Sequence, residues 1–255
     1  MSFLHNPISD VQSIANNLRD RYKSGFPILK EIVQNADDAK AQNLIIGWHP
    51  GLKDVDHPLL KDPGFFFVND APLTEADVKG IRTLGLGSKA DDTNAVGKFG
   101  LGMKSLFHLG ELYFFIGSDW QEYQGKYPKA DVLNPWDELR KEWNSFSDLD
   151  KKAIQQALSP VTNAFNDDAY VFIVWIPLRS VSIAQARGED GNNYIYNSED
   201  YGREVPNFLT DSNLASQLGQ LFPMLKHLRT IQGCSFAANE SDPRELFSTE
   251  IVKTV

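Results

Sequence analysis

The order of apolar and polar residues in the first 40 positions predicts two helices. Residues 10–23 carry apolar side chains at helical spacing, and Ser9 or Asp10 is suited to cap this segment. Residues 25–27 (Gly-Phe-Pro) break the pattern, and the proline suits the first turn of a second helix. That second helix is expected over residues 28–40.

Short continuous apolar runs predict buried strands. These runs lie at residues 44–48, 65–68, 112–116 and 170–176. A further strand is expected over 249–255, where the chain ends. Because the sequence stops on an expected strand, we expect it to be a piece of a longer protein.

Other segments have helical character. They lie at residues 103–109, at 136–143 and 150–158 within a helical region spanning 120–168, and at 214–228. Thr74 suits a helix cap, with Asp77 at the third position. Pro223 is expected to break the last helix. The polar stretch 184–206 is expected to be rich in loops.

Composition limits the class of protein. The length of 255 residues allows one large domain or two small ones, and a single cysteine, Cys234, excludes an internal disulfide. A reducing, cytoplasmic setting is therefore expected, with neither a membrane span nor a secretory signal in the sequence. The formal net charge of −9 argues against general nucleic-acid binding. It is compatible with a small anion held by backbone N–H groups and a metal.

The second helix carries a polar edge suited to metal and water chemistry. Glu31, Asn35 and Asp38 stand at positions i, i+4 and i+7, so a helix stacks them along one edge. Carboxylate and amide oxygens suit Mg²⁺, and a carboxylate beside the ion could orient an attacking water. The alternative is an ordinary amphipathic helix with a polar edge. The presence of Asn35, Asp37 and Asp38, all weak helix formers, favours a functional role.

A glycine-rich loop precedes the helix expected at 103–109. Residues 97–105 read Gly-Lys-Phe-Gly-Leu-Gly-Met-Lys-Ser. Glycines allow close backbone approach, and the free N–H groups of a following helix point toward an anion. The spacing differs from both common phosphate-binding glycine motifs. Taken alone, the loop is weak evidence for phosphate binding, and an ordinary helix entry is the default interpretation.

Together and in this order, these features resemble the GHKL ATPase superfamily of gyrase, the heat-shock chaperone of ninety kilodaltons, histidine kinases and MutL. The sequence is most similar to the sacsin-type branch of the chaperone-like ATPases. The motifs that carry the resemblance lie at residues 31–39, 67–77, 97–109 and 174–179. The similarity is clear over residues 28–112.

The resemblance implies a role for each polar residue of the first two motifs. Glu31 matches the general base that activates water, and Asn35 matches the residue whose side-chain oxygen binds Mg²⁺. Asp38 matches an acidic position near the ribose and adenine end. Asp70 matches the aspartate that accepts the adenine amino group.

The third motif and the segment before it match the phosphate-binding and lid elements of the family. Residues 83–95 would form a lid, with Gly85 and Gly87 as hinges and with Ser88 and Lys89 meeting the phosphates. The phosphate cradle would comprise Gly97, Lys98, Phe99, Gly100, Leu101 and Gly102.

The resemblance also implies the fold and domain organisation. The fold would be a two-layer α/β sandwich of the Bergerat type, with helices on one face of a mixed sheet. Residues 1–255 would form a single ATPase domain at the N-terminal part of a longer protein, with a core over about 10–180, a helical insert over about 120–168 and a C-terminal extension over 181–255. Two departures concern the base pocket: Ala71-Pro72 replaces the usual glycines, and Phe172 replaces a threonine.

The implied function is Mg²⁺-dependent binding and hydrolysis of ATP that drives lid closure in a larger chaperone-like protein, with weak activity in the isolated domain. The expected cofactors are ATP or ADP and Mg²⁺. The expected partners are further domains or a partner protein supplying a catalytic Lys or Arg, and a second copy in a homodimer. Alternatives are a non-hydrolysing nucleotide switch and a protein-interaction module.

Overall fold

The computed structural model describes eleven stretches of the chain. These are residues 25–74, 77, 81, 103–110, 112–119, 129–133, 146–163, 165, 170–178, 204–238 and 240–251. The helices expected at 10–23 and 136–143, the lid at 83–95 and the glycine loop at 97–102 lie outside these residues, as does most of the loop expected at 184–206.

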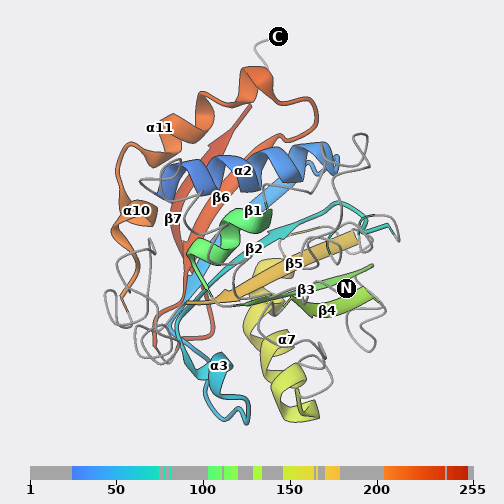
Figure 1. The fold of residues 1–255 in the computed structure, drawn as a ribbon. Helices are drawn as coiled ribbons and strands as arrows, with labels where there is room; N and C mark the ends of the chain where they lie inside the picture. Colours follow the sequence, from blue (N-terminus) through green and yellow to red (C-terminus); the bar gives the residue numbers. More distant parts are fainter. Residues whose placement is uncertain are drawn as a thin grey trace, which may run out of the picture.

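The described strands form one mixed sheet (Figure 1). Its seven strands follow the order β4-β3-β5-β2-β1-β6-β7. Their bounds are β1 Asn43–His49, β2 Gly64–Asn69, β3 Tyr113–Asp119, β4 Lys129–Leu133, β5 Tyr170–Pro177, β6 Thr230–Ser235 and β7 Arg244–Glu250. The β1–β6 pair is parallel and the other pairs are antiparallel. The C-terminal strands β6 and β7 thus extend the sheet that β1 and β2 begin.

Helical elements connect and cover these strands. The helices are α2 Gly25–Asp38, α3 Pro58–Lys61, α7 Asp148–Thr162, α10 Asn207–Thr210 and α11 Leu214–Gly219, and the 3₁₀ helices are η1 Met103–His108 and η3 Phe222–Met224. In Figure 1, α2 and η1 lie together, whereas α7 lies well apart from them.

The two faces of the sheet bury two separate apolar clusters. Along β5, Phe172, Val174 and Ile176 join the cluster that also contains the buried residues of α2, η1 and α11. The alternate residues of β5 join a second cluster with the buried residues of α7. Because side chains alternate along a strand, α2 and α7 cover opposite faces.

The expectation that helices cover only one face is therefore wrong. Strand β5 reads Tyr-Val-Phe-Ile-Val-Trp-Ile-Pro, with apolar side chains directed to both sides. A strand of this kind must be covered on both faces, because otherwise one apolar row would meet water. Helix α7 supplies the second cover through Ile154, Leu158 and Val161.

Most of the apolar runs match strands or helices of the structure. The predicted strands at 44–48, 65–68, 112–116 and 170–176 correspond to β1, β2, β3 and β5, and the helix predicted at 28–40 corresponds to α2. The segment expected at 150–158 is the middle of α7, whose N-terminus has a capping box between Ser147 and Asp150. Thr74 and Asp77 likewise exchange hydrogen bonds at the cap predicted for them.

Four boundaries or element types differ from the sequence prediction. The segment after residue 102 is 3₁₀ rather than α-helical, and the helix expected over 214–228 ends at Gly219. The insert expected to be helical contains β4, which pairs with β3. Strand β7 begins at Arg244 and ends at Glu250, so the strand predicted from residue 249 overlaps only its last two positions.

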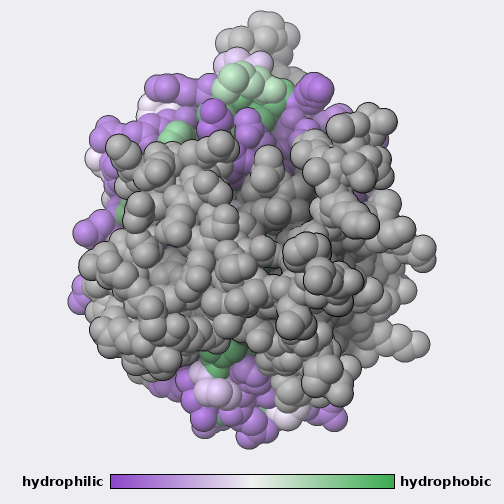
Figure 2. Space-filling view, in the orientation of Figure 1, coloured by the Kyte–Doolittle hydropathy of each residue, from purple (hydrophilic) through white to green (hydrophobic). Residues whose placement is uncertain are grey.

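The described surface has few large apolar side chains. In the view of Figure 2, the described residues are mostly hydrophilic, with small hydrophobic areas between them. Among the described residues, Leu149 and Met224 are the large apolar side chains that are exposed. No described helix has both the length and the apolar character needed to cross a bilayer.

Candidate functional site

Helix α2 holds the polar residues of the first motif along one edge. Its apolar residues Ile28, Leu29, Ile32, Val33 and Ala36 are buried against the sheet. Glu31 and Asn35 are partly buried at the margin of this contact, and Asp38 is exposed. The helical spacing thus brings the three predicted residues together along one side of α2.

The C-terminal end of α2 is fixed by a buried carboxylate. Asp37 is 6% exposed, and its Oδ1 accepts backbone N–H groups from Lys226 at 3.0 Å, His227 at 2.7 Å and Leu228 at 2.9 Å. Its Oδ2 lies 3.0 Å from the Lys226 nitrogen. Burial alone would raise the pKa of Asp37, but these hydrogen bonds and nearby His227 outweigh it and lower the pKa. Asp37 therefore ties α2 to the segment that leads into β6.

The 3₁₀ helix of the third motif packs against α2. Met103, Leu106 and Phe107 belong to the same apolar cluster as the buried side of α2. Direct contacts join the two elements, as their adjacent positions in Figure 1 indicate. Met103, the first residue of η1, directly follows the expected phosphate cradle in the sequence, and η1 itself contacts α2.

The predicted residues of the lid and the cradle lie outside the described residues. They are Ser88, Lys89, Gly97, Lys98, Phe99, Gly100, Leu101 and Gly102. Their assignment to phosphate binding stays a prediction. In the part of the chain that is described, no group of three or more His, Cys, Asp or Glu side chains is arranged to hold a metal ion by itself.

The end of β2 directs two neighbouring polar residues to different faces. Asn69 is 2% exposed and its Oδ1 accepts the backbone N–H of Ala71 at 3.0 Å. The Oδ1 of Asp70 accepts the N–H groups of Gln42 at 2.8 Å and Asn43 at 3.0 Å. Its Oδ2 accepts the side-chain amide of Asn43 at 2.7 Å. Asp70 therefore fixes the connection between α2 and β1.

Phe172, which replaces the threonine of the family, packs against two other aromatic rings. The Phe172 ring is 5% exposed, and its centroid lies 6.3 Å from those of Phe67 and Phe115. These three side chains belong to the cluster on the α2 side of the sheet. The sheet floor beside Asn69 is therefore aromatic and apolar, with no hydroxyl at this position.

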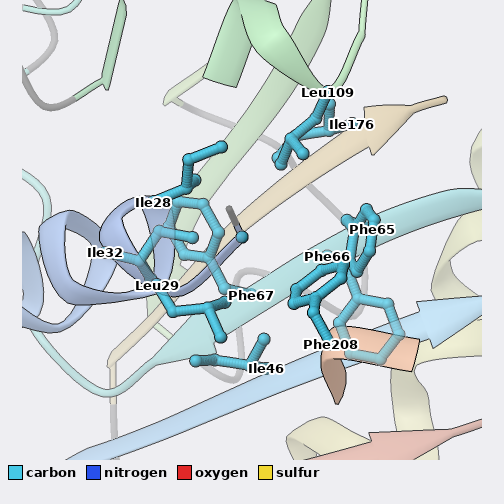
Figure 3. A pocket seen from close by; sticks show the side chains of 11 residues that line it. Ile28, Leu29, Ile32, Ile46, Phe65, Phe66, Phe67, Leu109, Ile176 and Phe208 are labelled. Carbon is cyan, nitrogen blue, oxygen red and sulfur yellow. The ribbon is translucent and has the colours of Figure 1, made fainter. Parts of the chain in front are cut away.

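A small cavity lies under α2, inside the apolar core (Figure 3). Side chains of α2 point into it from one side and those of β1 and β2 from the other. The lining residues are Gly25, Ile28, Leu29, Ile32, Ile46, Phe65, Phe66, Phe67, Leu109, Ile176 and Phe208. With a volume of about 10 Å³ and an apolar lining, it is a packing defect too small for a nucleotide.

The sequence interpretation assigned no site role to three residues of this region. They are Asp37, Asn43 and Asn69. The alternation of β2 places Asn69 on the face of Phe67, so its orientation could have been predicted once the strand was assigned. The partners of Asp37 and Asn43 lie far along the chain, and no local pattern indicates them.

The fold and the α2 edge define a class: an α/β protein with a mixed sheet whose polar first motif lies on a helix covering one face. A sequence model of the family described as Sacsin domain matches residues 9–248, and the chain belongs to this family. Among curated proteins, human Sacsin is 35% identical to it over 117 residues. That match covers 44% of the chain but only 2% of the human protein.

Proposed function

We propose that this chain binds and hydrolyses ATP as a GHKL-type domain of a larger chaperone-like protein. The observation that carries the proposal is the edge of α2, where Glu31 and Asn35 lie partly buried beside the apolar side of the helix. Membership of the Sacsin domain family supports it, as does the order of the four motifs along the sequence. The two-layer Bergerat core is part of this proposal, with α7 as an addition on the second face.

Asn35 is suited to hold Mg²⁺. Its side chain is partly buried and makes no hydrogen bond within the described residues, and amide oxygen is among the ligands that Mg²⁺ accepts. When bound, Mg²⁺ would neutralise charge on the phosphates. Asn35 would contribute one ligand, and the remaining ligands would be phosphate and water oxygens.

Glu31 is the residue that would act on water. It lies one helical turn before Asn35, so both side chains lie on the same side of α2. A carboxylate in this position accepts a hydrogen bond from water and aligns it for attack on the terminal phosphate. Asp38 follows one turn further along and is exposed, which fits a contact at the sugar end of the nucleotide.

The test combines titration of ATP and ADP with a phosphate-release assay on the 255-residue chain at millimolar Mg²⁺. Glu31→Gln is expected to lower turnover at least a hundredfold while ATP affinity stays within about threefold. Glu245→Gln, at an exposed position of β7, is the matched control. It should leave the turnover and the ATP affinity unchanged.

Three results would contradict the proposal in different ways. Full turnover by Glu31→Gln would remove Glu31 from the mechanism. Binding of ATP without turnover by the unmodified chain would replace hydrolysis with the non-hydrolysing switch. No binding of ATP or ADP would leave the interaction module as the remaining function.

A further inference from the structure

The strand register places Asn69 on the sheet face that α2 covers. Directly opposite residues of neighbouring strands project to the same face. Asn69 lies opposite Leu44 of β1 and opposite Phe172 of β5. Leu44 and Phe172 both belong to the α2-side cluster. Asn69 is therefore the polar residue at the end of β2 that faces the same side of the sheet as the proposed nucleotide site.

Asp70 belongs to a different structural unit. Asp70 follows the last residue of β2, and its carboxylate accepts a hydrogen bond from the side-chain amide of Asn43 in β1. The carbonyl of the Asn43 side chain in turn accepts the hydroxyl of Thr230 in β6. This row of three polar side chains links the residue after β2 to the first residues of β1 and β6. With two backbone N–H groups also bound to it, the Asp70 carboxylate is already used in holding the sheet end together.

The hydrogen bond to Ala71 fixes which way the Asn69 amide faces. Only the carbonyl oxygen of an amide can accept an N–H group, so Oδ1 is directed to the Ala71 nitrogen. The Nδ2 group makes no hydrogen bond within the described residues and is a donor. Asn69 is 2% exposed. A base can therefore contact its side chain only where this end of the sheet is uncovered.

We propose that Asn69, and not Asp70, contacts the base of the bound nucleotide, and that its amide lets the site accept 6-amino and 6-oxo purines with similar affinity. This inference rests on the proposed nucleotide binding. A carboxylate only accepts hydrogen bonds, so it favours the 6-amino group of adenine and disfavours a 6-oxo group. The Nδ2 group of Asn69 can donate to N1 of adenine or to O6 of hypoxanthine. Leu44 and Phe172, the register partners of Asn69, carry no polar side-chain group that would distinguish the two bases.

The experiment measures the affinities of ATP and ITP, whose bases differ in the 6-substituent and the protonation of N1. The unmodified chain should bind the two within about threefold of each other. Asn69→Asp retains an acceptor for the Ala71 N–H and should shift the preference toward ATP by at least tenfold at pH 8, where the added carboxyl is ionised. Asp70→Asn should lower the melting temperature and leave the ATP-to-ITP ratio unchanged.

The outcomes separate the two levels of inference. If the unmodified chain binds ATP but Asn69→Asp leaves the ratio unchanged, or if Asp70→Asn shifts it, the assignment of Asn69 is overturned and nucleotide binding stands. If the unmodified chain binds ATP at least tenfold more tightly than ITP, the tolerance for both bases is overturned. If it binds neither nucleotide, the proposed function fails and the assignment fails with it.

Discussion

Asp37 provides the most direct test of how this fold holds its first motif in place. The carboxylate joins α2 to the turn before β6, nearly 190 positions further along the chain, through three backbone N–H groups. The hydrogen bond from the Leu228 N–H is buried, whereas those from Lys226 and His227 are partly buried. Removing the carboxylate therefore leaves at least one donor with neither a protein partner nor water.

The expected cost follows from these contacts. A hydrogen bond to a charged group contributes about 1.5–3 kcal/mol, and an unsatisfied buried donor costs about 1–3 kcal/mol. Because water can reach two of the three donors, Asp37→Ala should lower the free energy of unfolding by about 2–4 kcal/mol. Asp37→Asn retains an oxygen acceptor but loses the charge and directs an NH₂ group at the Lys226 N–H. We expect that variant to lose about 1–2 kcal/mol.

The measurement is denaturant unfolding at pH 7, followed by circular dichroism, with Asp54→Asn as the matched control. Asp54 is exposed, and at its positive φ of 53° asparagine is well tolerated. A change below about 0.5 kcal/mol for Asp37→Ala would refute the reasoning, because surface substitutions fall in that range.

The pH dependence gives a second measurement of the same contact. The pKa of Asp37 is lowered from its usual 3.8, so the carboxylate stabilises the folded state above that pH. This stabilisation is lost as the pH falls through the folded-state pKa. The loss should be absent in Asp37→Asn, and an unchanged acid profile in that variant would show that other groups cause it.

Two further predictions concern buried titratable groups on the sheet. Burial lowers the pKa of His49 from 6.5 to about 4. As the pH falls, the unfolded chain therefore binds a proton at this residue before the folded chain does. The free energy of unfolding should fall by up to about 3 kcal/mol between pH 6.5 and 4. His49→Asn, which keeps an acceptor for the Gly51 N–H, should remove that share of the decline in unfolding experiments; an identical decline in the variant would contradict the assignment. Burial raises the pKa of the Cys234 thiol to about 12, so a thiol reagent at pH 8 should label the folded chain roughly a thousandfold more slowly than the denatured chain. Equal labelling rates would contradict this prediction and show that the sheet opens readily around β6.

The sequence predicted the elements whose apolar pattern is local and strong. Strands β1, β2 and β5 were predicted within two residues at each end, because their apolar runs are uninterrupted and bounded by turn residues. The strand β4 was not predicted, since its sequence Lys-Ala-Asp-Val-Leu has neither a continuous apolar run nor a regular alternation. It is held by pairing with β3, which a local pattern cannot reveal.

The C-terminal part illustrates the same limit. Strand β6 reads Thr-Ile-Gln-Gly-Cys-Ser, which is too polar to predict a central strand. It is nevertheless inside the sheet because β1 pairs with it on one side and β7 on the other. The glycine has a packing reason, since a side-chain carbon at Gly233 would overlap the ring of Phe247. Such a contact depends on tertiary pairing and carries no sequence signal.

The candidate site was predictable to the extent that one helix contains it. The spacing of Glu31, Asn35 and Asp38 determines that they share an edge once α2 forms. Their relation to η1 required the motif order given by the resemblance, because these elements are about 65 residues apart in the chain. For Asp70, the motif indicates the residue type but the sheet register determines which way the side chain faces.

The acidic residues of this chain show why residue type alone does not determine a role. Asp37, Asp70 and Asp150 each accept two or three backbone N–H groups from distant segments. The pKa of Asp150 is lowered, since its hydrogen bonds from His57, Ser147 and Asp56 outweigh the effect of burial. Each of these carboxylates therefore binds backbone N–H groups where the chain approaches or enters the next element, which is β6, β1 and α3 respectively. Glu31 and Asp38 instead share one edge of α2, where helical spacing places them on the same side of the helix.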